Sequence, residues 1–133
     1  MAALDTNVIV RFLMQDDAAQ ATAARRLVRH ALDAGEPLFV PVSVALELEW
    51  VLRSRFELDK AAVLQKFSQL LSTVELNFEA DTALEWALRQ HRTSSADFSD
   101  CLHAALAVRA GERPLWTFDK AAAKLDGARL LAA

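Results

Sequence analysis

The sequence has few of the residues that mark several large classes of protein. It contains one cysteine, Cys101, so an internal disulfide framework is excluded and a reducing compartment is expected. Three glycines and three prolines among 133 residues are too few for a disordered or loop-rich all-β chain. The three histidines lack the spacing of zinc ligands, and neither of the glycine-rich phosphate-binding motifs, GxGxxG or Walker A, occurs.

Long apolar runs are also missing. The longest, Leu38–Leu52, contains Glu47 and Glu49 and is too short to cross a bilayer, so no membrane association is expected. Asp5 interrupts the first apolar run before a signal peptide could form. The sequence therefore predicts a cytoplasmic protein.

The residues that are present indicate one globular α/β domain over residues 1–133, because 53% of them are apolar and 25% are charged. Short apolar runs alternate with segments of helical period, as in βαβ units around a parallel sheet. The expected strands are residues 2–4, 38–42, 73–76 and 115–118, with 128–131 as a fifth. The expected helices are residues 7–14, 17–34, 43 (as N-cap) to 55 or 56, 60–71, 79–91 and 96–110, with a short helix after residue 119. The prediction is a doubly wound domain, with a central, mostly parallel sheet of four or five strands and helices on both faces.

Acidic residues occupy related places in this map. Asp5 and Asp119 follow the C-terminal ends of strands, and Glu47, Asp97 and Asp100 lie in the first turns of helices. Because crossover helices run antiparallel to the strands, helix N-termini and strand C-termini meet at one sheet edge, where ligands bind in open α/β folds. The acids are therefore expected to converge on one cleft.

Convergent carboxylates raise one another's pKa unless a cation neutralises them. Ligands that are all oxygen favour Mg²⁺ or Mn²⁺, and such a cation supplies hydroxide and stabilises charge during phosphodiester hydrolysis. With a net charge of −3 the whole molecule does not attract nucleic acid, so RNA would be held by bound metal or by a local basic patch.

Each acid also has a structural alternative. Asp5 and Asp119 could cap the helices that follow them, and Asp97, three residues after Ser94, could complete a capping box. Asp100 lacks such a role, although the helix dipole favours an acid at its position.

Two glutamates on one helix are distinguished by their neighbours. Glu47 is expected on an apolar face with Val44, Trp50 and Val51, where an unpaired acid would be costly, which favours a functional role. Glu49 has an arginine at i+4 and is expected to form a surface pair.

The remaining polar and aromatic residues are assigned mainly to packing. Cys101 is expected in the core, His103 half-buried, and the three tryptophans on core faces. The basic candidates for RNA binding form three groups: Arg25, Arg26 and Arg29; Arg53 and Arg55; and Arg89, His91 and Arg92. The last group is nearest to the acidic edge, so Arg89 and Arg92 are the candidates for contacting the RNA backbone.

The order of these motifs resembles the PIN-domain family. Residues 4–7, LDTN, resemble the opening of PIN domains, where the aspartate, here Asp5, is a metal ligand. Residues 44–52, VALELEWVL, are similar to the second motif, whose glutamate corresponds to Glu47. Thr6 lies within the first motif and is expected to assist the acids.

The second half of the chain carries the other two motifs. Residues 97–105, DFSDCLHAA, resemble the third motif, in which Asp100 corresponds to the principal ligand and Asp97 to an accessory acid. Cys101 departs from the alanine that is common there. Residues 117–120, TFDK, resemble the fourth motif, whose acid corresponds to Asp119, with Thr117 as an accessory residue.

The resemblance implies a PIN-like three-layer α/β/α fold whose catalytic and metal-binding residues are Asp5, Glu47, Asp100 and Asp119. Among PIN proteins, a small single domain is most similar to VapC toxins. This implies an endoribonuclease dependent on Mg²⁺, with Mn²⁺ as a substitute, that is usually a homodimer. It further implies tRNA or ribosomal RNA as substrate, and a VapB-type antitoxin whose C-terminal segment occupies the acidic groove.

The sequence is also compatible with two other interpretations. A receiver-type signalling domain has a similar fold with acids at strand ends, but it needs a phosphorylatable aspartate where this chain has Leu76-Asn77-Phe78, and it does not explain Glu47. A PIN-like module that only binds RNA or protein would not need the complete set of acids.

Overall fold

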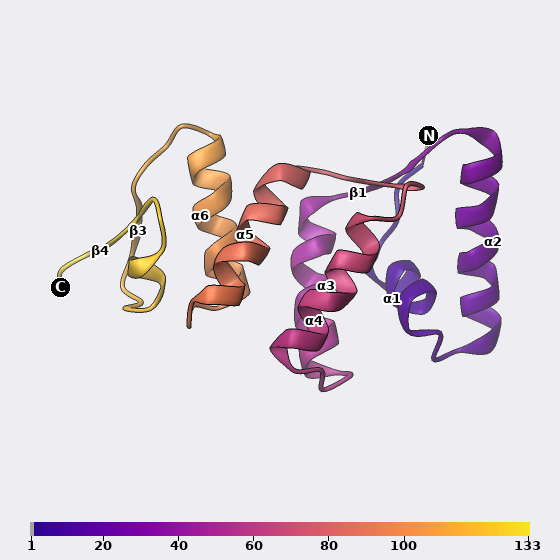
Figure 1. Cartoon of the computed structure of the whole chain (residues 1–133), viewed down its shortest axis with the longest axis horizontal. Coiled ribbons are helices and arrows are strands. Elements are labelled where there is room, and N and C mark those ends of the chain that lie inside the picture. Colours follow the sequence, from indigo (N-terminus) through magenta and orange to yellow (C-terminus); the bar gives the residue numbers. More distant parts are fainter. Residues whose placement is uncertain (1) are drawn as a thin grey trace. The chain divides into compact units, whose positions relative to one another are not determined.

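A computed structural model describes residues 2–133 (Figure 1). The chain forms two compact units, one up to Glu79 and the other from Ala80 to Ala133. No helix formed by residues 2–133 combines the length and the apolar character needed to cross a bilayer.

The first unit packs four helices around a short parallel pair of strands. Its elements are α1 (Thr6–Met14), α2 (Ala18–Ala34), β1 (Leu38–Val40), α3 (Val42–Ser54), α4 (Lys60–Leu71) and β2 (Leu76–Phe78). Strands β1 and β2 are parallel, with Leu38 opposite Leu76. Residues 2–4 run beside β1, since the Leu4 amide donates to the Phe39 carbonyl at 2.9 Å. The expected N-terminal strand is therefore present as a parallel bridge.

The second unit packs two helices with a second parallel pair. Its elements are α5 (Asp81–Thr93), α6 (Phe98–Arg109), β3 (Leu115–Thr117), the 3-10 helix η1 (Ala122–Lys124) and β4 (Ala128–Leu130). Strands β3 and β4 are parallel, with Leu115 opposite Ala128. Leu84 of α5 and Phe98 and Leu102 of α6 are buried in its core, and so is Cys101, as expected.

The helices and the parallel pairing predicted from the sequence are confirmed, and the α/β class with them. The strands are shorter than predicted. In place of one sheet of four or five strands, residues 2–133 form two pairs of three-residue strands, one pair in each unit. The strand expected at 73–76 lies instead at Leu76–Phe78, where Leu76 and Phe78 are buried, whereas Val74 is 75% exposed. Burial of alternate side chains, which defines a half-buried strand, therefore begins later than expected.

The start of α3 was also placed wrongly. Ser43 was expected as its N-cap, but the helix begins at Val42 and its N-cap is Pro41, with φ −58°. Proline suits this place because it has no amide proton to leave unsatisfied. The amide of Val42 donates to Glu79 Oε1 at 2.8 Å, so a side chain distant in sequence satisfies the first free donor of the helix.

Candidate active site

Asp5 stands where the segment beside β1 turns into α1. Its Oδ1 accepts the Val8 amide at 3.1 Å, so the capping role considered from the sequence is real. Asp5 is exposed, and within residues 2–133 no hydrogen bond engages its second oxygen. Capping therefore leaves one carboxylate oxygen available to a ligand.

Thr6, the next residue, connects the first motif to the second. Its hydroxyl is buried at the start of α1 and donates a hydrogen bond to Oε1 of Glu47 on α3. Helices α1 and α3 pack against each other, so two acids 42 positions apart in sequence lie on either side of one threonine. The first unit thus links the residue that follows Asp5 to Glu47.

The faces of α3 are not those expected. Glu47 is exposed, whereas Glu49 is only 5% exposed. The pair between Glu49 and Arg53 exists, with Nε to Oε2 at 3.0 Å, but the prediction of a surface pair is wrong for the glutamate. Trp50 is 56% exposed rather than part of the core.

Because Glu49 is buried, neutralising it should have a measurable cost. The Glu49→Gln protein is expected to lose about 1–2 kcal/mol of unfolding free energy, since a buried charge-assisted hydrogen bond is weakened. RNA cleavage should stay unchanged. Urea unfolding measures the difference, with the exposed Glu85→Gln as matched control. Equal stability of the two variants would contradict the structural role.

The second unit holds the other acids. Asp97 is the N-cap of α6, Asp100 lies in the first turn of that helix, and Asp119 follows β3. Partial burial raises the pKa of Asp100, and the negative charges of Asp119 and Asp97 raise it further, while His103 lowers it. The three carboxylates therefore lie close enough for their charges to affect one another.

The local bonds of these acids differ. Asp119 Oδ1 accepts the Ala122 amide at 2.8 Å, and its own amide donates to Thr117 Oγ1 at 3.0 Å. Asp97 makes no side-chain capping bond, and Ser94 Oγ accepts the Ala96 amide at 3.4 Å instead. The capping box considered for Ser94 and Asp97 is therefore not formed, and the Asp97 carboxylate is not used to cap the helix.

These donors suit a hard divalent cation. They are all carboxylate oxygens, the ligands that such a cation prefers, and burial together with the charges of Asp119 and Asp97 raises the pKa of Asp100. Within residues 2–133, no group of three or more histidine, cysteine, aspartate or glutamate side chains is arranged to hold a metal by itself. Asp5 and Glu47 lie in the first unit, and Asp97, Asp100 and Asp119 lie in the second.

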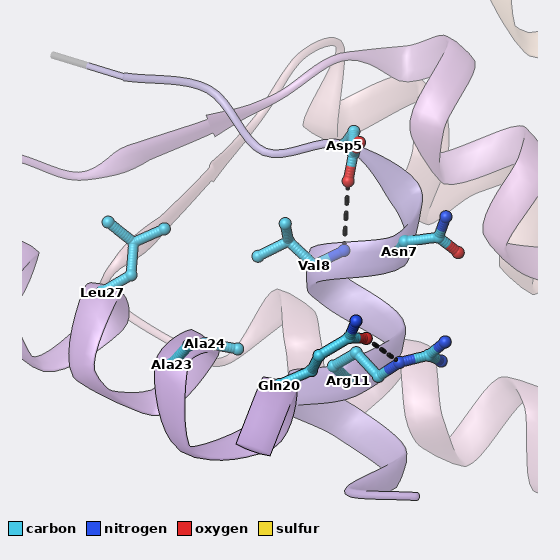
Figure 2. A pocket seen from close by; sticks show the side chains of 8 residues that line it. All are labelled: Asp5, Asn7, Val8, Arg11, Gln20, Ala23, Ala24 and Leu27. Atoms are coloured by element: carbon cyan, nitrogen blue, oxygen red, sulfur yellow. Dashed lines mark hydrogen bonds between the residues drawn. The ribbon is translucent and has the colours of Figure 1, made fainter. Parts of the chain in front are cut away.

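A pocket of about 310 Å³ lies beside Asp5, between α1 and α2 (Figure 2). It is lined by Asp5, Asn7, Val8, Arg11, Gln20, Ala23, Ala24 and Leu27. Arg11 is held at one end, since its Nε donates to Gln20 Oε1 at 2.6 Å and its guanidinium lies 3.3 Å from Asp16. The pocket thus combines an apolar wall from α2 with polar groups next to a motif aspartate.

The basic group near the third motif is only partly available for RNA. Arg89 and Arg92 of α5 are exposed, as an RNA contact requires. His91 is buried, with Nδ1 3.0 Å from the Ala96 carbonyl, so its place among the RNA candidates was wrong. His103 is exposed instead of half-buried, and Trp116 is 53% exposed instead of lying on a core face.

Comparisons with known proteins give a family match and a relative. Residues 2–128 match the family described as PIN domain, a match that runs through both units. The chain is also 25% identical over 125 residues to a VapC ribonuclease of Aquifex aeolicus (strain VF5). That alignment covers 94% of this chain and 92% of the relative.

Proposed function

The chain belongs to the PIN-domain family, and from this we propose that it is a metal-dependent endoribonuclease, the toxin of a type II toxin–antitoxin pair. The observation that carries the proposal is the link between two motifs, in which Thr6, the residue next to Asp5, donates a hydrogen bond to Glu47. The similarity to a VapC ribonuclease along nearly the whole chain supports the same reaction. A receiver-type domain is disfavoured, since β2 carries Asn77 where a phosphorylatable aspartate is required.

We further propose that both units act as one PIN domain over residues 1–133. Each unit holds only part of the acid set, and the family match extends through both. Asp5, Glu47, Asp100 and Asp119 then form one site, with Asp97 as an accessory acid.

The side chains have distinct tasks in this site. Asp5 and Asp100 are the main ligands of Mg²⁺, or of Mn²⁺ in its place, and Glu47 and Asp119 complete the site directly or through water. When bound, the cation would supply an activated water and neutralise charge on the phosphate. Thr6 holds Glu47 by its hydroxyl, and Thr117 fixes the backbone at Asp119. Because these two threonines hold the acids in place, less free energy is needed to assemble the site before RNA binds.

The substrate class proposed is structured cellular RNA, either tRNA or ribosomal RNA. Arg89 and Arg92, exposed on α5, contact its phosphates. The direct test is cleavage of total RNA by the purified protein, with and without Mg²⁺, followed by sequencing of the new 5′ ends. A defined set of cleavage sites supports an endoribonuclease, and intact RNA at every metal concentration would contradict the proposal.

The partner proposed is a VapB-type antitoxin, with the toxin itself a homodimer. The C-terminal segment of the antitoxin covers the acidic groove and places apolar side chains in the pocket beside Asp5. The support is the lining of that pocket, where Ala23, Ala24 and Leu27 adjoin the motif aspartate. Light scattering of the toxin alone and of the complex gives both stoichiometries.

A charge placed in this pocket separates antitoxin binding from catalysis. The Leu27→Arg protein is expected to bind the antitoxin at least about tenfold more weakly, because an apolar contact is replaced by a charge that must lose water. Cleavage of RNA should be unchanged. Calorimetric titration of the antitoxin measures the effect, with Leu32→Arg, on the same helix but not in the pocket lining, as control. Equal loss in both variants would place the antitoxin elsewhere.

A further inference from the structure

His91 is a buried histidine that the proposed reaction does not use. It lies at the end of α5 and is 9% exposed. Its Nδ1 is 3.0 Å from the carbonyl oxygen of Ala96, and since a carbonyl can only accept, Nδ1 carries the proton and donates. Its ring meets the Phe98 ring edge-on, with 5.8 Å between centroids and 70° between planes.

These two contacts lie on either side of a motif acid. Ala96 precedes Asp97 and Phe98 follows it, and both neighbours are almost fully buried, at 2% and 1% exposure. Asp97 itself has no side-chain capping bond. Contacts of Ala96 and Phe98 with His91 therefore help to fix the start of α6.

Asp100 belongs to the helix turn that begins at these contacts. The Asp97 carbonyl accepts the Cys101 amide at 3.1 Å, which closes the first turn of α6, and Asp100 is part of that turn. Helix ends fray unless their first turn is fixed by caps or packing. A change at the Ala96 carbonyl thus reaches both carboxylates of the third motif.

We propose that His91 is a positioning residue, which holds the start of α6 so that Asp97 and Asp100 present their carboxylates to one divalent cation. The inference rests on the proposed function, because it assumes that these acids bind metal. His91 would thus help to orient metal ligands without touching the metal. Loss of residues with this role commonly lowers metal affinity by about 10–100-fold.

Two substitutions separate this role from simple core packing. His91→Asn is smaller than histidine but keeps an N–H near the position of Nδ1. His91→Leu keeps apolar volume and removes the donor. If His91 only fills the core, His91→Leu should keep more of the metal affinity. If His91 holds the Ala96 carbonyl, His91→Asn should keep more of it.

The measurement is the affinity of the full-length protein for Mn²⁺, followed by the electron paramagnetic resonance of the free ion, under conditions where each variant is folded. His91→Leu is expected to bind Mn²⁺ at least about tenfold more weakly, with a similar fall in kcat and little change in KM for RNA. His91→Asn should restore most of the affinity. Leu84→Val, a buried change on the same helix away from the α6 start, is the control for lost stability alone.

The outcomes distinguish this inference from the function on which it rests. Wild-type affinity for Mn²⁺ in His91→Leu would overturn the positioning role. So would an equal loss of affinity in His91→Leu and His91→Asn, or in His91→Leu and Leu84→Val. A wild-type protein that binds Mn²⁺ but leaves all RNA intact would refute the ribonuclease, while the order of the His91 variants would still test their effect on the metal site. A wild-type protein that binds no Mn²⁺ would overturn both.

Discussion

The Asp5→Asn protein is expected to fold normally and to cleave RNA at least about tenfold to a hundredfold more slowly than the wild type. Asparagine keeps the shape of aspartate and is an equally good N-cap, so its side-chain oxygen can still accept the Val8 amide. What it removes is the negative charge that a cation requires from a main ligand. Initial rates of cleavage at saturating Mg²⁺ measure the loss, and EDTA should reduce the wild-type rate to the same low level.

A matched control separates the ligand role of Asp5 from its capping role. Asp17 is also an exposed N-cap, and its Oδ1 accepts the Gln20 amide at 3.0 Å at the start of α2. Asp17→Asn makes the same chemical change in the same unit, outside the four motifs, and should leave cleavage intact. Undiminished cleavage by Asp5→Asn, or by the wild type in EDTA, would refute the proposed chemistry.

The hydrogen bond between the first and second motifs illustrates what the sequence predicts well. Strand ends and helix starts share one edge of an α/β sheet by topology alone. The motifs at those positions can therefore be predicted from the sequence to lie near one another. The bond between Thr6 and Glu47 agrees with this rule. The placement of Asp97 and Asp119 near Asp100 follows the same logic in the second unit.

The faces of α3 show where periodicity fails. Every residue from Val42 to Leu52 is apolar except Ser43, Glu47 and Glu49. The spacing of apolar residues therefore does not tell which face of the helix is buried. Packing of α3 against α1 and α4 decides the choice, and it turns Glu49 inward and Glu47 outward. Contacts between helices distant in sequence carry this information.

His91 was misplaced for a different reason, and here the sequence held a usable signal. The charged residues near it on α5, Arg89 and Arg92, are typical of a solvent-exposed helix end. The spacing of Leu84, Ala87, Leu88 and His91 nevertheless places the histidine on the buried stripe of that helix. The partner of its ring nitrogen, the carbonyl of Ala96, is a backbone atom and leaves no trace in side-chain patterns.

Asp100→Asn is expected to abolish most cleavage and also to make the metal-free protein more stable at neutral pH. The pKa of Asp100 is raised from 3.8 by burial and by the charges of Asp119 and Asp97. The folded protein therefore binds this proton more tightly than the unfolded chain does, and ionised Asp100 opposes folding. Asparagine removes that opposition and the cation ligand at the same time.

The pH dependence gives the sign of this effect. In wild-type protein with EDTA, the stability contributed by protonated Asp100 is lost as the pH rises from about 3.8 through the higher pKa of the folded state. Asp100→Asn lacks this loss, so its melting temperature in EDTA should exceed that of the wild type at pH 7 and approach it near pH 3. Mg²⁺ should raise the wild-type melting temperature, since a ligand at 100 times its Kd stabilises a protein by about 2.7 kcal/mol, and should leave the variant almost unchanged. Calorimetric scans of both proteins across this pH range, with EDTA and with Mg²⁺, test the prediction. A variant that melts below the wild type in EDTA at pH 7 would show that the Asp100 carboxylate stabilises the fold, contrary to this prediction.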